Sequence, residues 1–325
     1  MTSNPTIFEK AIAGSRLYDE DIRRLSDQSR AAGEIFEALA VADVRAACDV
    51  FMPLYQQSAG ADGFVSLEVS PTLAHEAAGT IHEAERLWGA VARPNAMIKI
   101  PGTSAGLPAI THCIAAGINV NVTLLFSVER YSQVIEAFLT GLETRLTRGL
   151  PLQATASVAS FFVSRVDGKV DALLDTTPNH PLRARIAIAN AGMAYGVFER
   201  TLGTARWDRL ARAGARPQRP LWASTSTKDP RLPDVYYVEA LAAPQTVNTL
   251  PPETLDAYRD HGNPAIRIHQ SVSAAPAQLE ALAKAGINLE TVTRELEADG
   301  VAKFAASYAA VLGGIEAKAG ALAGR

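Results

Sequence analysis

Residues 96–126, AMIKIPGTSAGLPAITHCIAAGINVNVTLLF, decide the fold, because they are predicted to form a strand, a helix and a second strand. The apolar, β-prone run 96–102 ends at a Pro-Gly pair. The helical pattern of 104–116 opens at a serine and is closed by a glycine, and the β-prone run 118–126 follows. Two apolar strands joined through a helix predict a parallel sheet that is covered by helices.

The same alternation continues along the chain. Further β-prone runs lie at 63–70, 156–166, 220–225 and 246–251. The pattern predicts an α/β fold, and a (β/α)₈ barrel rather than an open doubly wound sheet, because polar residues inside the strands need an interior or a mouth to face. An amphipathic helix is predicted at 127–148. In the tail, 289–325, one helical stripe is predicted to pack on the barrel; it consists of Val301, Phe304, Tyr308, Val311 and Ile315.

Composition narrows the class of protein. The 325 residues are 48% hydrophobic, which is ample for a large core, and no Gly/Ser linker divides them, so one domain over 1–325 is predicted. A net charge of -3 with interspersed signs gives no footprint for nucleic acid or an anionic membrane. No apolar run approaches about 18 residues, so no membrane span is predicted.

The residues that commonly bind metals or form disulfides show no suitable spacing. Cys48 and Cys113 form no CxxC motif, which favours a reducing compartment and a cytoplasmic protein. The histidines show no metal-binding pairing, so surface or structural roles are predicted for them. They are His75, His82, His112, His180, His261 and His269. No metal site is predicted.

Polar residues inside neighbouring strands predict a site. Residues at i and i+2 of a strand share a face, so Asn121 and Thr123 lie together, as do Ser66 and Glu68. Lys99 is the single charge in its apolar run. Glu68, Lys99, Asn121 and Thr123 are therefore candidate inward-facing groups.

This set suits Schiff-base chemistry. Burial disfavours the ammonium form, and a neutral amine at Lys99 attacks a carbonyl substrate. Glu68 is predicted to move protons through a water held by Thr123, and Asn121 to bind substrate hydroxyls. Two plainer interpretations stay open: Lys99 is a structural partner of Glu68, or Asn121 and Thr123 satisfy each other or the backbone at a strand end.

A second group of residues suits a phosphate. Ser160 and Arg165 lie near the end of the 156–166 run, and Ser224 and Lys228 follow another strand. The alternatives are a surface or salt-bridged arginine and a solvated turn. The segment PGTSAG lacks the Gly-Lys-Ser/Thr ending of a P-loop and is predicted to be a turn, and neither GxSxG nor a strand-associated GxGxxG is present.

Seven motifs together resemble transaldolase over essentially the whole chain. They are TSNPTIFEKAI at 2–12, DGFVSLEVSP at 62–71, MIKIPGT at 97–103, INVNVTLLFS at 118–127, SVASFFVSRVD at 157–167, RPLWASTSTKDP at 219–230 and TVNTLP at 246–251. The resemblance, to the longer bacterial-type transaldolases, implies a (β/α)₈ barrel in pentose phosphate metabolism. It implies transfer of a dihydroxyacetone unit between sugar phosphates without a cofactor. The expected couple is sedoheptulose 7-phosphate and glyceraldehyde 3-phosphate with erythrose 4-phosphate and fructose 6-phosphate.

The resemblance also implies roles for single residues. Lys99 matches the Schiff-base lysine, and Glu68 with Thr123 matches the pair that holds the catalytic water. The remaining matches are Asn4 and Asn121 for contacts to the dihydroxyacetone part, Ser160 for a substrate contact and Arg165 for the phosphate. The family's second phosphate-binding arginine would fall near Ser226, where this sequence has none, and Ser224 with Lys228 is the predicted substitute.

The position of the first motif leads to a further expectation. TSNPT belongs to the second barrel strand of the family, yet it begins here at Thr2. The first strand, its helix and its proton-transferring aspartate are therefore expected to be missing, either through a start assigned within a longer gene or a truncation, or in a barrel that is open. Turnover by this chain is expected to fall by about 10²–10⁴-fold from the lost proton transfer.

Rival functions are a lysine aldolase that releases a free product, such as one acting on fructose 6-phosphate or deoxyribose phosphate, and a non-catalytic sugar-phosphate-binding barrel. The oligomeric state is left open, with a homodimer as one option.

Overall fold

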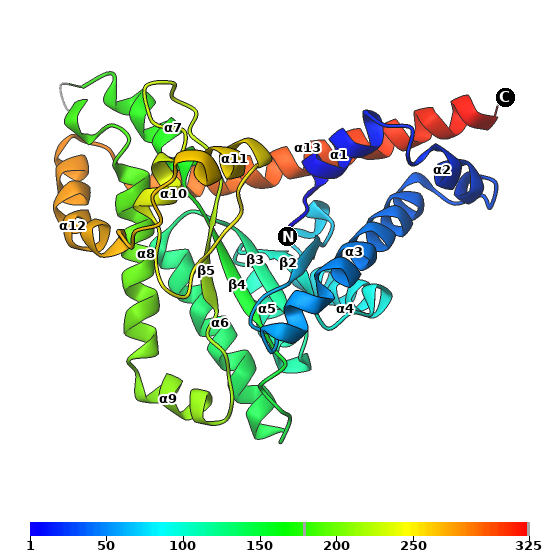
Figure 1. The fold of residues 1–325 in the computed structure, drawn as a ribbon, viewed down its shortest axis with the longest axis horizontal. Helices are drawn as coiled ribbons and strands as arrows, with labels where there is room; N and C mark the ends of the chain where they lie inside the picture. Colours follow the sequence, from blue (N-terminus) through cyan, green and yellow to red (C-terminus); the bar gives the residue numbers. More distant parts are fainter. Residues whose placement is uncertain (178–179, 324–325) are drawn as a thin grey trace.

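The central element is a parallel sheet of six strands that pair in the order of the chain (Figure 1). The computed structural model describes residues 1–177 and 180–323. The strands are β1 (Val65–Glu68), β2 (Ala96–Pro101), β3 (Val120–Leu125), β4 (Ser157–Phe162), β5 (Arg219–Ala223) and β6 (Val247–Asn248). Five of the six are almost entirely buried, as expected for parallel strands covered by helices.

The sheet is curled into a half-barrel. Thr2 forms an isolated parallel bridge with Ser66 and so extends the sheet beyond β1. Within residues 1–177 and 180–323, no strand pairing joins β6 to this N-terminal segment. The predicted α/β architecture and parallel sheet are confirmed, whereas the described strands number six rather than the eight of a closed barrel.

Helices connect and cover the strands. The helices from the start of the chain to β5 are α1 (Pro5–Ala13), α2 (Asp19–Ser26), α3 (Ala32–Gln57), α4 (Ala77–Val91), α5 (Gly106–Ala116), α6 (Val128–Thr147), α7 (Ser164–Leu174), α8 (Ile186–Leu202) and α9 (Ala205–Arg212). Those after β5 are α10 (Tyr236–Ala240), α11 (Pro252–His261), α12 (Ile268–Lys284) and α13 (Leu289–Ala323). Two short 3₁₀ helices lie at Pro71–Leu73 and His180–Leu182.

Local sequence explains most of these boundaries. The helix α6 begins where the Ser127 side chain accepts a hydrogen bond from the Arg130 amide, and α5 ends at Gly117 with φ +84°. The predicted strand 156–166 is too long, because it stops at Phe162 and α7 begins at Ser164.

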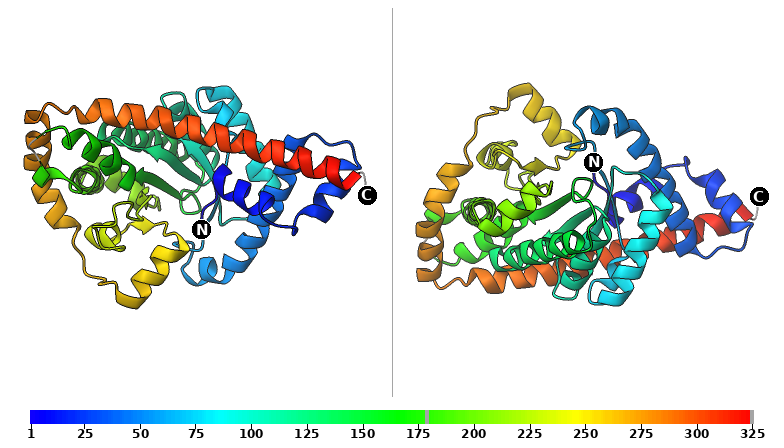
Figure 2. Two further views of the ribbon diagram at one scale, coloured as in Figure 1. Left: turned by 90° about the horizontal axis from the view of Figure 1, so that it is seen from above. Right: turned by 90° about the horizontal axis from the view of Figure 1, so that it is seen from below.

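The C-terminal helix α13 runs along most of the molecule, across the sheet and beside α1 (Figure 2). The predicted stripe does pack inward, since Phe304, Val311 and Ile315 are buried and Val301 and Tyr308 are half-buried.

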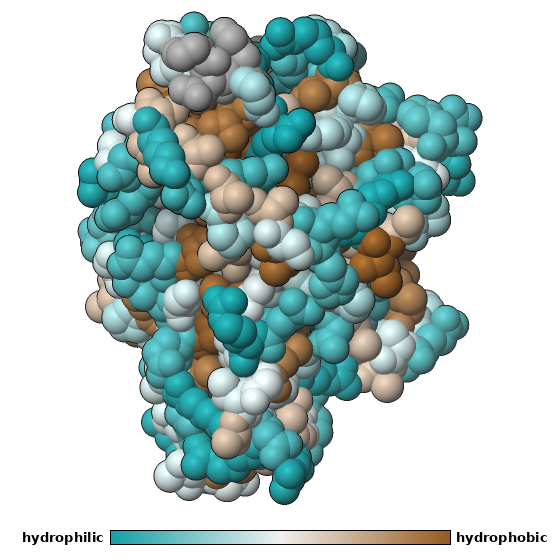
Figure 3. All heavy atoms as spheres, turned by 90° about the vertical axis from the view of Figure 1, so that its left-hand side faces the viewer, coloured by the Kyte–Doolittle hydropathy of each residue, from teal (hydrophilic) through white to brown (hydrophobic). Residues whose placement is uncertain are grey.

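The side of the molecule shown in Figure 3 is mainly hydrophilic, with hydrophobic side chains in patches between the charged ones. Among the described residues, no helix combines the length and apolarity that crossing a membrane requires.

Candidate active site

Lys99 and Glu68 form a buried ion pair at adjacent positions of β2 and β1. Lys99 Nζ donates to Glu68 Oε2 at 2.9 Å and to the Ser3 carbonyl oxygen at 3.2 Å. The two side chains are only 6% and 4% exposed. The pairing that the sequence left open is therefore present, and the amine is held in one place between two acceptors.

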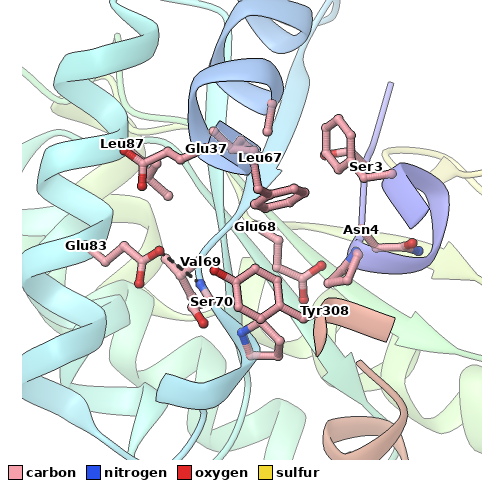
Figure 4. Close-up of a pocket in the computed structure, with 15 residues that line it drawn as sticks. Ser3, Asn4, Glu37, Leu67, Glu68, Val69, Ser70, Glu83, Leu87 and Tyr308 are labelled. Atoms are coloured by element: carbon pink, nitrogen blue, oxygen red, sulfur yellow. Dashed lines mark hydrogen bonds between the residues drawn. The ribbon is translucent and has the colours of Figure 1, made fainter. Parts of the chain in front are cut away.

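The second carboxylate oxygen of Glu68 is left for other chemistry. Burial raises the pKa of Glu68, and the Lys99 ammonium and its hydrogen bond oppose that rise. Glu68 Oε1 is buried and has no hydrogen-bonding partner in residues 1–177 and 180–323. Figure 4 shows Glu68 in a cleft that Asn4 and Tyr308 also line. An oxygen of this kind is free to exchange a proton with a small polar molecule.

Asn121 lies beside Lys99 on β3 and links two serines from other strands. Its Nδ2 donates to Ser66 Oγ at 3.0 Å, and its Oδ1 accepts from Ser160 Oγ at 2.7 Å. All three side chains are buried. Asn121 and Thr123 therefore do not satisfy each other. The Thr123 hydroxyl is fully buried and has no partner in the described chain.

The backbone is irregular immediately after Thr123. The pairing of β3 with β4 shifts register between Val122 and Leu125, and Leu124 has φ +60°, a left-handed conformation that is rare for a leucine. Such strain is often found at functional sites. It indicates that the packing around this strand end dictates the conformation.

The N-terminal segment completes this side of the site. Asn4 caps α1, with its Oδ1 accepting from the Ile7 amide at 2.9 Å. Ser3 is buried, and its hydroxyl donates to the Ser66 carbonyl at 2.7 Å. Ser3 was not predicted from the sequence, because its contact with Lys99 is made by a backbone carbonyl, which every residue type has.

Ser224 lies against Ser164, the first residue of α7, and Arg165 is the next residue of that helix. Arg165 is half-buried, its Cζ lies 5.0 Å from the centre of the Phe162 ring, and no ion pair engages it in the described chain. Burial lowers the pKa of Arg165. Ser224 Oγ lies 3.1 Å from Ser164 Oγ. These groups suit an anionic ligand better than an internal salt bridge.

Lys228 stands apart from this group. Its side chain is exposed, and Nζ donates to Ser226 Oγ at 2.9 Å. Across residues 1–177 and 180–323, no hydrogen bond joins Lys228 to Ser224. The structure thus places Ser224 against Ser164, the residue before Arg165, and shows no hydrogen bond for the predicted Ser224–Lys228 pair within the described residues.

The side chains that bind metals are scattered over the molecule. Among the described residues, no group of three or more His, Cys, Asp or Glu side chains could hold a metal ion.

Comparison with known proteins identifies the family. The model of the Transaldolase/Fructose-6-phosphate aldolase family matches residues 1–315. The chain belongs to this family. The resemblance predicted from the seven motifs is confirmed.

Curated members of the transaldolase family are similar over almost the whole chain. A transaldolase of Parafrankia sp. (strain EAN1pec) is 51% identical over 99% of this chain and 89% of its own length. That of Acidothermus cellulolyticus is 53% identical over 95% of this chain and 84% of its own length. That of Trichodesmium erythraeum is 44% identical over 98% of this chain and 87% of its own length.

Proposed function

We propose that this protein is a transaldolase that uses Lys99 as a Schiff-base nucleophile on a ketose phosphate. The observation that carries the proposal is the buried Lys99 amine, held 2.9 Å from Glu68 and paired across the sheet with Asn121, two residues before a buried Thr123 hydroxyl that has no partner in the described chain. Similarity to proteins named transaldolase over nearly all of this chain supports the same activity.

The reaction begins at the substrate ketone. The Lys99 nitrogen adds to C2, and Glu68 passes a proton to the new hydroxyl, so that water leaves and an iminium forms. A water bound between Glu68 and Thr123 relays this proton. The burial that raises the pKa of Glu68 makes its protonated form easier to reach, which suits a carboxyl group that both gives and takes protons.

Carbon–carbon cleavage follows from the iminium. The C3–C4 bonding pair moves toward the iminium nitrogen, the C4 hydroxyl loses its proton, and an aldehyde phosphate leaves. The enamine that remains on Lys99 adds to an acceptor aldehyde phosphate, and hydrolysis releases the new ketose. We assign no side chain to the removal of the C4 hydroxyl proton.

We assign the remaining site residues to binding. Asn4, Asn121 and Ser160 contact the dihydroxyacetone part, and Arg165 with Ser224 holds the phosphate. Lys228 serves as an outer phosphate contact from its exposed loop. An unchanged KM for fructose 6-phosphate in Lys228→Ala would remove Lys228 from this list.

We also propose that residues 1–325 act as one cytoplasmic domain. One connected apolar core contains residues from Phe8 to Ile315. The free cysteines, Cys48 and Cys113, are consistent with a reducing compartment.

The test is the formation of glyceraldehyde 3-phosphate from fructose 6-phosphate with and without erythrose 4-phosphate. We expect product formation to require the acceptor, and Lys99→Met to abolish it. A fructose-6-phosphate aldolase is the second candidate, because the matching family model covers both activities. Acceptor-independent release of dihydroxyacetone would favour the aldolase, and a folded protein with neither activity would favour a binding protein.

A further inference from the structure

An aromatic ring from the far end of the chain covers the reactive lysine. Phe304 of α13 is 3% exposed, and the centre of its ring lies 5.6 Å from Lys99 Nζ. The two residues are far apart in the sequence, so only the docking of α13 on the sheet brings them together. At this distance, a ring face attracts a cation.

A glycine one turn earlier allows α13 to come this close. Gly300 and Phe304 are spaced i and i+4, so they lie on the same face of the helix. A Cβ atom at Gly300 would lie 2.9 Å from Leu124 Cδ2, which is closer than side chains normally approach. Gly300 thus packs against the strained Leu124 that follows Thr123. This contact fixes the height of Phe304 above the sheet.

Polar contacts fix α13 on both sides of Phe304. Before it, Glu295 forms an ion pair with Lys169 at 2.7 Å. After it, Ser307 lies in hydrogen-bonding distance of Thr6, at 2.8 Å. Because the helix is anchored at both points, the position of the Phe304 ring is fixed by the docking of α13.

We propose that Phe304 is a specificity-determining residue that directs the Lys99 adduct toward transfer and away from release. The inference rests on the proposed transaldolase function. The ring stabilises the cationic iminium and excludes bulk water, the proton source for release, from the enamine carbon next to C2.

The two fates of the adduct differ in what the enamine carbon bonds to, and both end with hydrolysis of an iminium at C2. In transfer, the enamine carbon attacks the acceptor aldehyde, and the aldehyde oxygen takes a proton. In release, the enamine carbon takes a proton to give the iminium, and water adds to C2 and loses a proton. The resulting carbinolamine collapses to dihydroxyacetone and the free Lys99 amine. A ring that keeps bulk water from the enamine carbon slows its protonation, and so hinders release before the acceptor arrives.

The experiment compares release with transfer in Phe304→Ala, Phe304→Leu and a matched control. Release is the formation of dihydroxyacetone from fructose 6-phosphate alone, and transfer is the formation of sedoheptulose 7-phosphate with erythrose 4-phosphate present. We expect Phe304→Ala to raise the ratio of release to transfer by about 10-fold or more, and Phe304→Leu by about 3-fold, because leucine keeps apolar bulk without a ring. Val311→Ala, a buried change on α13 two turns further on, should keep the wild-type ratio.

The outcomes separate the two proposals. If the wild-type protein catalyses transfer and both folded Phe304 variants keep its ratio, the role of Phe304 is overturned while the proposed function stands. The same ratio change in Val311→Ala would also overturn it, because general loosening of α13 would then explain the effect. If folded wild-type protein forms no Lys99 adduct, both proposals fail.

Discussion

The buried pair of Lys99 and Glu68 leads to a quantitative prediction about stability. The side chains are 6% and 4% exposed and 2.9 Å apart, so removal of one charge leaves the other without compensation in the protein interior. We predict that Glu68→Gln and Lys99→Met each lower the free energy of unfolding by about 3–5 kcal/mol at neutral pH. The double variant lacks both charges, so we predict that its loss in free energy of unfolding is at most half of the two single losses added together.

Urea unfolding measures these changes, followed by circular dichroism and by the fluorescence of the tryptophans, among which Trp222 is buried. The matched control is Glu280→Gln, which removes an i,i+4 pair with Lys284 whose side chains are 66% and 74% exposed. We predict a loss below about 0.5 kcal/mol for this control.

Two results would refute the reasoning about the pair. Single losses below about 1 kcal/mol would mean that the two charges are solvated like a surface pair. Strictly additive losses in the double variant would mean that the two side chains do not interact. In either case, the carboxylate beside Lys99 could not be poised for proton transfer by burial and by the ammonium together.

Three further predictions concern the neighbouring groups. Thr123→Val should leave the free energy of unfolding within about 0.5 kcal/mol, because its hydroxyl has no partner to lose in the described chain, yet lower kcat by about 10–100-fold in steady-state assays. Arg165→Leu should raise the KM for fructose 6-phosphate by about 10–100-fold and change kcat much less. Burial raises the pKa of Asp167 from 3.8 to about 7, so the folded protein holds this proton more tightly than the unfolded chain does. Its contribution to stability is full below pH 3.8 and is lost as the pH rises to about 7. Across that pH range, the free energy of unfolding of the wild-type protein should fall by on the order of 4 kcal/mol, and this fall should be absent in Asp167→Asn. Urea titrations at several pH values measure it, and a variant with an unchanged pH dependence would contradict the prediction.

Strand periodicity makes part of the site predictable. Inward-facing polar residues on neighbouring parallel strands must lie near one another, so the sequence alone predicts that Glu68, Lys99 and Asn121 come together. The βα alternation likewise predicts the parallel sheet and the helices between its strands. These features depend on local spacing, which a single sequence displays directly.

The missed features depend on contacts between distant segments. The Ser3 carbonyl at Lys99 and the Phe304 ring above it are placed by the docking of both chain ends. No local sequence pattern predicts either contact. The left-handed Leu124 is a leucine where such a conformation would favour glycine, so packing against Gly300 overrides local preference. The predicted strand to 166 is too long for a similar reason. The amides of Val163 and Ser164 donate to the carbonyls of Ala223, the last residue of β5, and of Ser224, which follows it, and α7 begins there.

The central claim is that Lys99 forms a covalent imine with a ketose phosphate. The most direct test incubates the protein with fructose 6-phosphate and borohydride, which reduces an imine to a stable amine, and maps the adduct by peptide mass. We predict one adduct, on the peptide that carries Lys99, and none in Lys99→Met. A folded protein with no adduct, or with its adduct on another lysine such as Lys228, would contradict the claim.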